Sequence, residues 1–240
     1  MCLTPITVKT TKGQRVSAPC GLCAECIEKH RQGWLLRLTE HAKQYDELCF
    51  VTFTIENEHL CYSNYAPTLV KEDIQLYLKR LRKALKNRKI TYFIIGEYGS
   101  QFERPHYHAL FFGISKEDED LISSNWHQGF TQVKEVIPER INYVTYYHIL
   151  KTSAPEGVQK PFALISKGIG KNYVDKFIDW HREYPYERAF YRKYQYKKDL
   201  PRYYKEKLFT KREKGAIAIM ARKRAERKML DEAKNECIEN

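Results

Sequence analysis

Two histidines separated by one residue are the first feature of this sequence that could support chemistry. His106 and His108 begin a run of apolar and aromatic residues, 106–112, which is typical of a β-strand. Alternate residues of a strand point to the same face, so both imidazoles would project together. Two imidazoles on one strand can hold one divalent metal ion. The alternative is a pair of ordinary strand histidines.

A carboxylate is available to complete such a site. Glu97 ends the preceding predicted strand, 90–97, and the connection contains Gly99 and Pro105, which is typical of a hairpin. Glu97 would then lie across from the histidines, with Glu103 as a competing third ligand. Two imidazoles and one carboxylate leave coordination positions open for water or a phosphate oxygen. Such a site suits Mg²⁺ or Mn²⁺ acting as a Lewis acid.

A second group of chemically capable side chains follows downstream. Tyr143, Tyr147 and Lys151 are spaced i, i+4 and i+8 on a predicted helix over 138–151, so they share one face. A tyrosine hydroxyl can attack a phosphodiester when a metal polarises the phosphate. The lysine cation would favour the phenolate. The alternative is a stripe of tyrosines that packs against the sheet.

The charge of the chain indicates an anionic partner. Among 240 residues, Lys and Arg number 42 and Asp and Glu 30, which gives +12 and a pI near 9.2. Nucleic acid is the commonest partner for such a surplus, and a merely basic surface is the alternative. Residues 202–228 alone hold 11 basic and 3 acidic residues. Arg104, Arg202 and Lys205 are the candidate phosphate contacts, and the tyrosines and arginines of 184–196 could stack on unpaired bases.

The cysteines indicate a reducing compartment. Seven is an odd number, which argues against a disulfide framework and for a cytosol. Cys20, Cys23, Cys26 and His30 form a possible Zn²⁺ set, with free thiols that pack an N-terminal arm as the alternative. The other four cysteines carry no functional expectation. No apolar run reaches the roughly 18 residues that a membrane span needs, so no membrane partner is expected.

The elements that position these residues predict an α+β fold, with helices packed on a central antiparallel sheet. Hydrophobic periodicity predicts helices over 23–45, 70–86, 116–126 and 138–151, strands over 48–55, 90–97, 106–112 and 129–136, and a basic tail helix from 216. Three segments are expected: an N-terminal arm and helix with the cysteines (1–46), a nuclease domain (47–209) and a basic helical tail (210–240). Residues 1–22 are expected to be irregular.

The ordered motifs resemble the HUH endonucleases. They are Phe50-Val51-Thr52-Phe53-Thr54, then Gly96-Glu97-Tyr98-Gly99 leading to Arg104-Pro105-His106-Tyr107-His108-Ala109-Leu110, and then the Tyr143/Tyr147 helix. More narrowly, the chain resembles the rolling-circle replication initiators of microviruses of the gokushovirus type. Pro19-Cys20-Gly21-x-Cys23-x-x-Cys26, Ser166-Lys167-Gly168-Ile169-Gly170 and Pro201-Arg202-Tyr203-Tyr204 support this likeness, which covers residues 19–209.

The resemblance implies a metal-dependent enzyme that nicks single-stranded or supercoiled origin DNA, keeps a 5′-phosphotyrosine link and later rejoins the strand. His106 and His108 would be metal ligands, and Tyr147 and Tyr143 nucleophiles. The family usually has Lys three residues after the second Tyr, whereas here Leu150 holds that position and Lys151 follows. The sequence contains no phosphate-binding loop of the Gly-x-x-x-x-Gly-Lys-Ser/Thr type, so a host helicase and polymerase are the expected partners, in the cytoplasm of a bacterial host.

Two other functions share parts of this pattern. One is a non-catalytic, single-stranded nucleic-acid-binding module with an antiparallel sheet and surface aromatics. The other is a transposase or relaxase that uses the same chemistry for another purpose. A binding module does not need His106, His108 and Tyr143 or Tyr147 to converge, and a nuclease does.

Overall fold

The computed structural model describes the chain except residues 1, 12, 100–101, 151–153, 155 and 239–240. Contacts divide the chain into two compact units, one of Met1–Gly33 with Tyr173–Asn240 and one of Trp34–Asn172. Each unit is described by itself. The three-segment division into arm, nuclease domain and tail stays a prediction.

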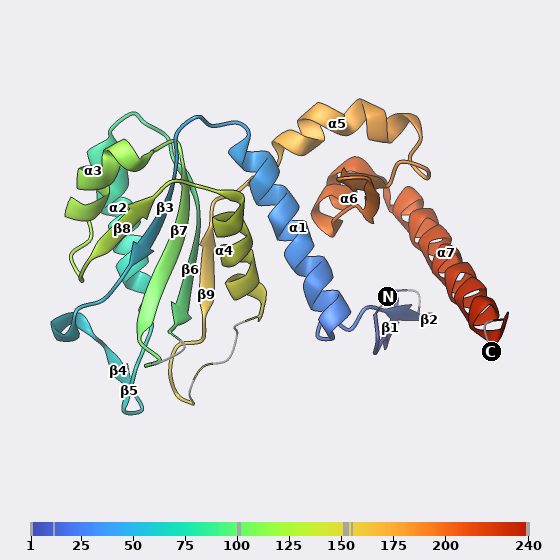
Figure 1. The fold of residues 1–240 in the computed structure, drawn as a ribbon, viewed down its shortest axis with the longest axis horizontal. Helices are drawn as coiled ribbons and strands as arrows, with labels where there is room; N and C mark the ends of the chain where they lie inside the picture. Colours follow the sequence, from blue (N-terminus) through green and yellow to red (C-terminus); the bar gives the residue numbers. More distant parts are fainter. Residues whose placement is uncertain (1, 12, 100–101, 151–153, 155, 239–240) are drawn as a thin grey trace. The chain divides into compact units, whose positions relative to one another are not determined.

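The larger unit is built on a five-stranded sheet in the order β8-β3-β7-β6-β9 (Figure 1). Every neighbouring pair is antiparallel, so the predicted α+β class with a central antiparallel sheet is confirmed. The strands, in chain order, are β3 (Leu48–Phe53), β6 (Thr91–Tyr98), β7 (Pro105–Phe112), β8 (Thr131–Lys134) and β9 (Phe162–Ile165).

Alternation along the strands gives the sheet two apolar faces. Val51, Ile94 and Phe111 belong to a core on one face, and Leu110 and Ile95 to a core on the other. This follows from the two-residue period of a strand, since the neighbours of a side chain on one face lie on the other. The sheet is therefore buried on both sides and needs helices on both.

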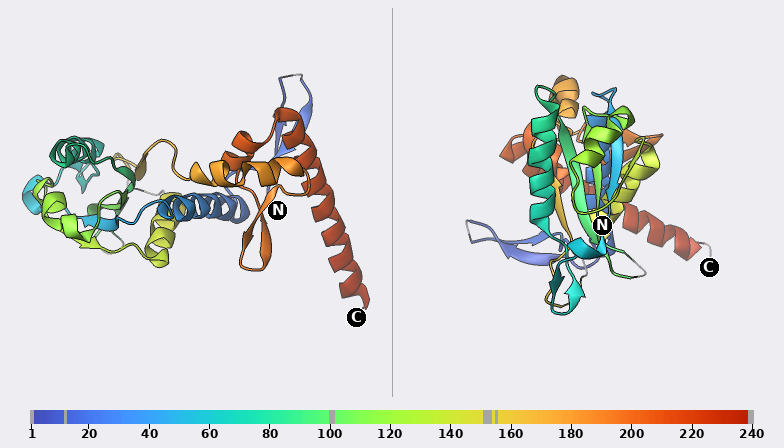
Figure 2. Two further views of the ribbon diagram at one scale, coloured as in Figure 1. Left: turned by 90° about the horizontal axis from the view of Figure 1, so that it is seen from above. Right: turned by 90° about the vertical axis from the view of Figure 1, so that its left-hand side faces the viewer.

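Helices supply these two layers. The helix α2 (Lys71–Leu85) buries Ile74, Leu78 and Leu81 at helical spacing and packs on the first face, near α3 (Glu119–Ser124). The helix α4 (Pro138–Leu150) contacts β6 and β7 on the second face. Figure 2 shows α2 and α4 on opposite sides of the sheet. Two short 3₁₀ turns, Asn57–His59 and Lys116–Asp118, and a two-residue ladder of β4 (Tyr62–Ser63) with β5 (Ala66–Pro67) complete this unit.

The smaller unit contains two hairpins and several helices. Its hairpins are β1 (Ile6–Lys9) with β2 (Arg15–Ala18), and β10 (Phe190–Lys193) with β11 (Tyr196–Asp199). Its helices are the first part of α1 (Ala24–Ala42), most of α5 (Asn172–Glu183), α6 (Arg202–Leu208) and α7 (Lys211–Ile238). Within the described residues, no helix combines the length and apolar character that crossing a membrane requires.

Most elements up to residue 150 match the sequence-based expectation, and the remainder differs. The arm over 1–22, expected to be irregular, contains the β1–β2 hairpin, whose residues are exposed apart from the partly buried Ala18. Its weak apolar pattern explains why periodicity did not reveal it. β9, α5, β10, β11 and α6 were not anticipated, and the tail helix begins at Lys211 rather than 216.

Candidate active site

The β6–β7 hairpin brings Glu97, His106 and His108 to one point on the sheet. Glu97 and His106 are direct partners in the strand register, and His108 lies two residues further along the central strand β7 on the same face. One ligand atom from each of the three side chains lies within 4.8 Å of the others. Glu103, the competing carboxylate, lies in the turn and is exposed, and it is not part of this group.

The three side chains share one carboxylate oxygen. His106 Nε2 lies 2.9 Å and His108 Nε2 3.4 Å from Glu97 Oε1. Glu97 is only 2% exposed, and its other oxygen, Oε2, is buried without a hydrogen-bond partner among the described residues. A buried carboxylate oxygen without a partner is costly, and a cation is the ligand that would satisfy it.

The outer hydrogen bonds of the histidines test whether a metal fits. His106 Nδ1 lies 3.1 Å from the carbonyl oxygen of Arg104, which can only accept, so this nitrogen carries a proton. Nε2 of a neutral His106 then presents a lone pair to Glu97 Oε1, and this contact requires either a second proton or a cation. His108 Nδ1 lies 3.1 Å from Thr52 Oγ1, which orients the second ring. Such outer-shell partners are usual for metal-bound histidines, so the donor set fits a divalent metal.

The electrostatics of the site keep the ligands in their metal-binding forms. Burial alone would raise the pKa of the Glu97 carboxyl, but the hydrogen bonds and charges of His106 and His108 lower this pKa to about 2. Burial also lowers the pKa of His108, and the charge of His106 adds to that effect against the opposing influence of Glu97. Glu97 is therefore ionised and His108 neutral at pH 7, as a metal site requires.

The helix α4 carries the predicted tyrosines to the same face. Its buried Ile141 and Val144 pack into the core of that face and fix the rotation of the helix. The Tyr143 hydroxyl donates a hydrogen bond to Glu97 Oε1 at 3.1 Å and lies 3.3 Å from His108 Nε2. The Tyr143 and Tyr147 ring centroids are 4.3 Å apart, as expected for i, i+4 neighbours.

The surroundings of the tyrosines differ. Tyr147 borders a hollow of about 160 Å³ together with Glu97, Phe162 and four other residues. Burial raises the pKa of the Tyr143 hydroxyl, and the charge of Glu97 and the neighbouring Tyr147 raise it further. A bound cation would oppose these effects, since positive charge stabilises a phenolate. Tyr146 is 46% exposed. Lys151 lies outside the described residues.

The three candidate DNA-contacting residues have different settings. Arg104 donates hydrogen bonds from its guanidinium to Ile55 O at 2.6 Å and to Asn57 Oδ1 at 2.7 Å, so it also secures the turn beside the histidines. In the smaller unit, the side chain of Arg202 is 92% exposed. Burial lowers the pKa of Lys205, whereas the nearby Asp199 raises it.

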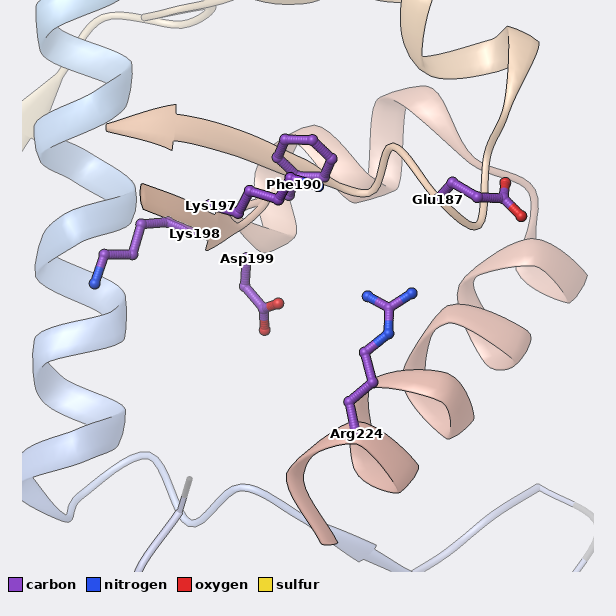
Figure 3. A pocket seen from close by; sticks show the side chains of 6 residues that line it. All are labelled: Glu187, Phe190, Lys197, Lys198, Asp199 and Arg224. Carbon is purple, nitrogen blue, oxygen red and sulfur yellow. The ribbon is translucent and has the colours of Figure 1, made fainter. Parts of the chain in front are cut away.

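A basic hollow of about 370 Å³ lies in the smaller unit (Figure 3). Lys197, Lys198 and Arg224 line it together with Asp199, Glu187 and Phe190. Asp199 forms a 2.8 Å ion pair with Lys29. The charges of Lys29, Lys205 and Arg224 lower the pKa of Asp199 against the effect of burial, so the hollow combines carboxylates with several cations.

Sequence reasoning missed the residues that orient the site. Thr52 faces His108 across the β3–β7 pair, and the Phe50 ring stacks on His108 at a centroid distance of 5.5 Å. Both belong to the Phe50–Thr54 motif, but their contacts depend on strand order.

The cysteine cluster also differs from the set expected from the sequence. The clustered sulfur atoms are those of Cys2, Cys20, Cys23 and Cys26, and His30 is not in this group. The expected set therefore omitted Cys2 and included His30 wrongly. The short spacing from Cys26 to His30 suggested a shared site, whereas Cys2 reaches the cluster through a hairpin that the sequence did not reveal.

The comparisons with known proteins agree with the resemblance in the motifs. Residues 48–153 match the family model of the replication-associated protein ORF2. Replication-associated protein ORF2 of Spiroplasma virus 4 is 31% identical over 65% of this chain and 57% of its own length. Replication-associated protein VP4 of Bdellovibrio phage phiMH2K is 25% identical over 78% of this chain and 66% of its own length. The chain is a relative of these phage replication proteins.

Other similarities cover smaller or weaker ground. Replication-associated protein ORF4 of Chlamydia phage 1 is 26% identical over 54% of this chain and 37% of its own length. This replication-protein relative thus spans from about a third to two thirds of the curated proteins that it matches. Among solved structures, the N-terminal nuclease domain of the minute virus of mice non-structural protein-1 is matched over 62% of this chain and 83% of that domain. The identity there is 13% and the TM-score 0.24, too low to carry an argument.

Proposed function

We propose that this chain initiates rolling-circle DNA replication by nicking single-stranded origin DNA, with a tyrosine as nucleophile and Mg²⁺ or Mn²⁺ as Lewis acid. The observation that carries the proposal is the position of the Tyr143 hydroxyl, 3.1 Å from Glu97 Oε1 and 3.3 Å from His108 Nε2. Tyrosine attack on a phosphodiester needs this combination of a hydroxyl and a metal-ligand set. The names of the phage relatives point to the same process.

The proposed ligands are His106 Nε2, His108 Nε2 and the Glu97 carboxylate. Two imidazoles and one carboxylate leave coordination positions for water and for a phosphate oxygen, and this set suits Mn²⁺ or Mg²⁺. When bound, the cation supplies positive charge that polarises the scissile phosphate. The Arg104 carbonyl and the Thr52 hydroxyl hold the two rings in place at 3.1 Å each.

In the proposed nicking step, the Tyr147 hydroxyl oxygen forms a bond to phosphorus, and the bond from phosphorus to the 3′ oxygen breaks. The phenol proton is lost, and the leaving 3′ oxygen gains a proton. One phosphodiester replaces another, so the bond energy is retained and no nucleotide is hydrolysed. Tyr147 is assigned the first cut because it borders the hollow that reaches Glu97, where a DNA strand has room to enter.

Tyr143 supplies the second hydroxyl in this scheme. Its ring lies 4.3 Å from that of Tyr147, so both hydroxyls belong to one face of α4. After one round of copying, Tyr143 cleaves the regenerated origin while Tyr147 retains the old 5′ end. The new 3′-hydroxyl then attacks the Tyr147 phosphotyrosine, which closes the circle and releases the tyrosine.

DNA binding in this scheme rests on basic residues in both units. Arg104, Arg202 and Lys205 are the proposed phosphate contacts, and the net charge of +12 favours attraction of the strand. A host helicase would unwind the template and a host polymerase would copy it, which places the reaction in the cytoplasm of a bacterial host.

The test is formation of a covalent adduct. Wild-type protein is incubated with single-stranded origin oligonucleotide and Mn²⁺, denatured and analysed by gel and mass spectrometry. We expect an adduct that carries the 3′-side fragment. Tyr147→Phe should slow the first cut by about 100-fold or more, Tyr143→Phe should slow it less, and the double variant should form no adduct.

The matched control is Tyr146→Phe, because Tyr146 is on the same helix and largely exposed. Phe retains the ring in every variant and removes only the hydroxyl, so a core cavity does not explain a loss. An adduct on the double variant would show that another residue is the nucleophile. The absence of an adduct from wild type, with intact DNA binding, would favour the binding-module function instead.

A further inference from the structure

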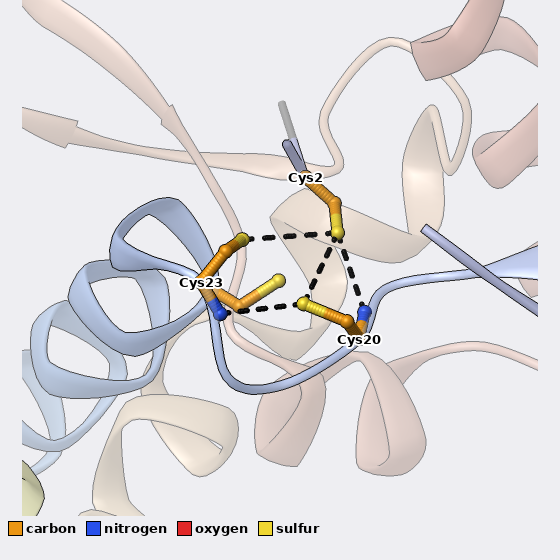
Figure 4. A group of neighbouring side chains, drawn as sticks. Cys2, Cys20 and Cys23 are labelled. Atoms are coloured by element: carbon orange, nitrogen blue, oxygen red, sulfur yellow. Dashed lines mark hydrogen bonds between the residues drawn. The ribbon is translucent and has the colours of Figure 1, made fainter. Parts of the chain in front are cut away.

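Four cysteine sulfurs converge in the smaller unit, and none of these residues belongs to the candidate active site. Cys2 comes from the chain start, Cys20 and Cys23 from the connection between β2 and α1, and Cys26 from the first turn of α1. All four Sγ atoms lie within 4.8 Å of one another. Figure 4 shows that Cys2, Cys20 and Cys23 point toward one another.

The spacing of the sulfurs fits a shared metal rather than a disulfide. Cys2 Sγ lies 3.5 Å from Cys20 Sγ and 3.8 Å from Cys23 Sγ. A disulfide would place two sulfurs about 2 Å apart. Four sulfurs at about 2.3 Å from one tetrahedral Zn²⁺ are about 3.8 Å from each other. The observed separations are close to this second value.

Backbone amides also point at these sulfurs. Leu22 N and Cys23 N donate to Cys20 Sγ at 3.4 and 3.3 Å, Cys20 N donates to Cys2 Sγ at 3.3 Å, and Leu3 N donates to Cys23 Sγ at 3.4 Å. The turn that aims the first two amides passes through Gly21, whose φ of +79° suits glycine. Amide donors stabilise thiolates, which are the metal-binding form of cysteine.

We propose that Cys2, Cys20, Cys23 and Cys26 bind one Zn²⁺ through four thiolates. The four thiols lose their protons to solvent on binding, and four Zn–S bonds form without any change of oxidation state. Four sulfur ligands complete a tetrahedral shell, so this is a closed structural site. It goes beyond the proposed nicking activity and uses none of its residues.

The site has a structural task in the β1–β2 hairpin. The two strands pair over four residues each, and all are exposed except the partly buried Ala18. An isolated two-stranded hairpin is marginally stable, because it buries too little apolar surface. Zn²⁺ would join Cys2, just before β1, to Cys20, just after β2, and would fasten both to the start of α1. The hairpin would then be held at its base by the metal.

The test measures metal content in the full-length chain. The background is His106→Ala/His108→Ala, so that any metal at the candidate active site does not contribute. We expect one Zn²⁺ per chain by elemental analysis and native mass spectrometry, and loss of at least about 90% of it in Cys2→Ser and in Cys20→Ser. Cobalt substitution should give the intense thiolate charge-transfer absorption of a tetrahedral Co²⁺ site, which is independent of DNA cleavage.

Two controls make the result specific. Cys61→Ser changes an exposed cysteine outside the cluster and should retain the metal, and His30→Ala should also retain it. Trypsin cleavage within the β1–β2 hairpin should accelerate at least about tenfold when a strong chelator removes the metal. The proposal is overturned by a chain that takes up no Zn²⁺ after reconstitution, by Cys2→Ser that keeps full metal content, or by iron in place of zinc. None of these outcomes bears on tyrosine adduct formation.

Discussion

Glu97 and His106 are direct partners across the β6–β7 pair, and Glu97 Oε1 lies 2.9 Å from His106 Nε2. The hairpin register alone therefore delivers a carboxylate to an imidazole. A shift of the register by one residue would send Glu97 to the opposite face of the sheet, into the core of α2. The register is fixed by the apolar residues of both strands, so the same packing that stabilises the sheet also assembles the metal ligands.

The first prediction concerns the charge of Glu97. Glu97→Gln retains the shape of the side chain but removes the negative charge that a cation needs. We expect Mn²⁺ affinity and the nicking rate to fall by about 100-fold or more, while DNA affinity changes little because it depends on phosphate contacts. Calorimetry with Mn²⁺ and nicking of an origin oligonucleotide measure the two effects. The control, Glu103→Gln, alters an exposed carboxylate in the adjoining turn. Equal losses in both variants would contradict a ligand role specific to Glu97.

The second prediction concerns Thr52, whose hydroxyl lies 3.1 Å from His108 Nδ1. Thr52→Val keeps the shape and removes the hydrogen bond, so the ring of His108 is less firmly oriented. Outer-shell changes of this kind lower metal affinity by about 10- to 100-fold. We expect a weaker Mn²⁺ affinity and a nicking rate that recovers at high Mn²⁺.

The control for Thr52 is the threonine two residues further along the chain. Thr54 donates its hydroxyl to Phe130 O at 3.2 Å, away from the histidines, so Thr54→Val should leave Mn²⁺ affinity unchanged. A nicking rate that stays low at saturating Mn²⁺ in Thr52→Val would show that Thr52 acts in some way other than through metal affinity.

The sequence was sufficient for the features that depend on local periodicity. The two-residue period of a strand placed His106 and His108 on one face, and the helical period placed Tyr143 and Tyr147 on another common face. The hairpin between 97 and 106 followed from its turn residues. These patterns are short in range, so each could be deduced without knowing the rest of the fold.

Relations between distant segments could not be deduced in this way. Glu97 and Glu103 were both possible ligands, and only the strand register separates them. Cys2 is 18 residues from Cys20, and no spacing rule links them. The β1–β2 hairpin escaped notice because its side chains are nearly all exposed, so it has no apolar stripe to reveal it.

The third prediction concerns His41 and acid. His41 is 6% exposed and hydrogen-bonds with Thr91 Oγ1 at 2.8 Å. Burial, with the charge of Arg37, lowers its pKa from 6.5 to about 4. Between these values the unfolded chain binds a proton that the folded chain does not, so stability decreases as pH falls from 6.5 toward 4. The loss from this one group is about 3 kcal/mol.

The measurement is urea unfolding of wild type and His41→Gln between pH 7 and pH 4. Other groups titrate over the same range, so the difference between the two proteins isolates His41. Wild type should lose about 3 kcal/mol more than the variant. His127→Gln replaces an exposed histidine and should follow wild type. Parallel curves for wild type and His41→Gln would show that His41 is not held neutral by the fold.

The last prediction concerns the basic tail helix. Arg222, Lys223, Arg224 and Arg227 are exposed on α7, and Arg224 also lines the basic hollow of the smaller unit. Changing all four to Gln removes positive charge and keeps good helix formers, without disturbing the buried Ile217. Each phosphate contact on single-stranded DNA contributes about 0.7 to the slope of log affinity against log salt. The slope should therefore fall by up to about 2.8, and the adduct on short oligonucleotides should still form, because no proposed catalytic group is changed. The matched control is Lys79, Lys83, Lys86 and Lys89, all changed to Gln. These four exposed lysines lie on and just after α2, on the sheet face opposite the tyrosines, and they carry the same total charge. If both sets lower the slope equally, the effect is one of net charge, and α7 does not contact DNA.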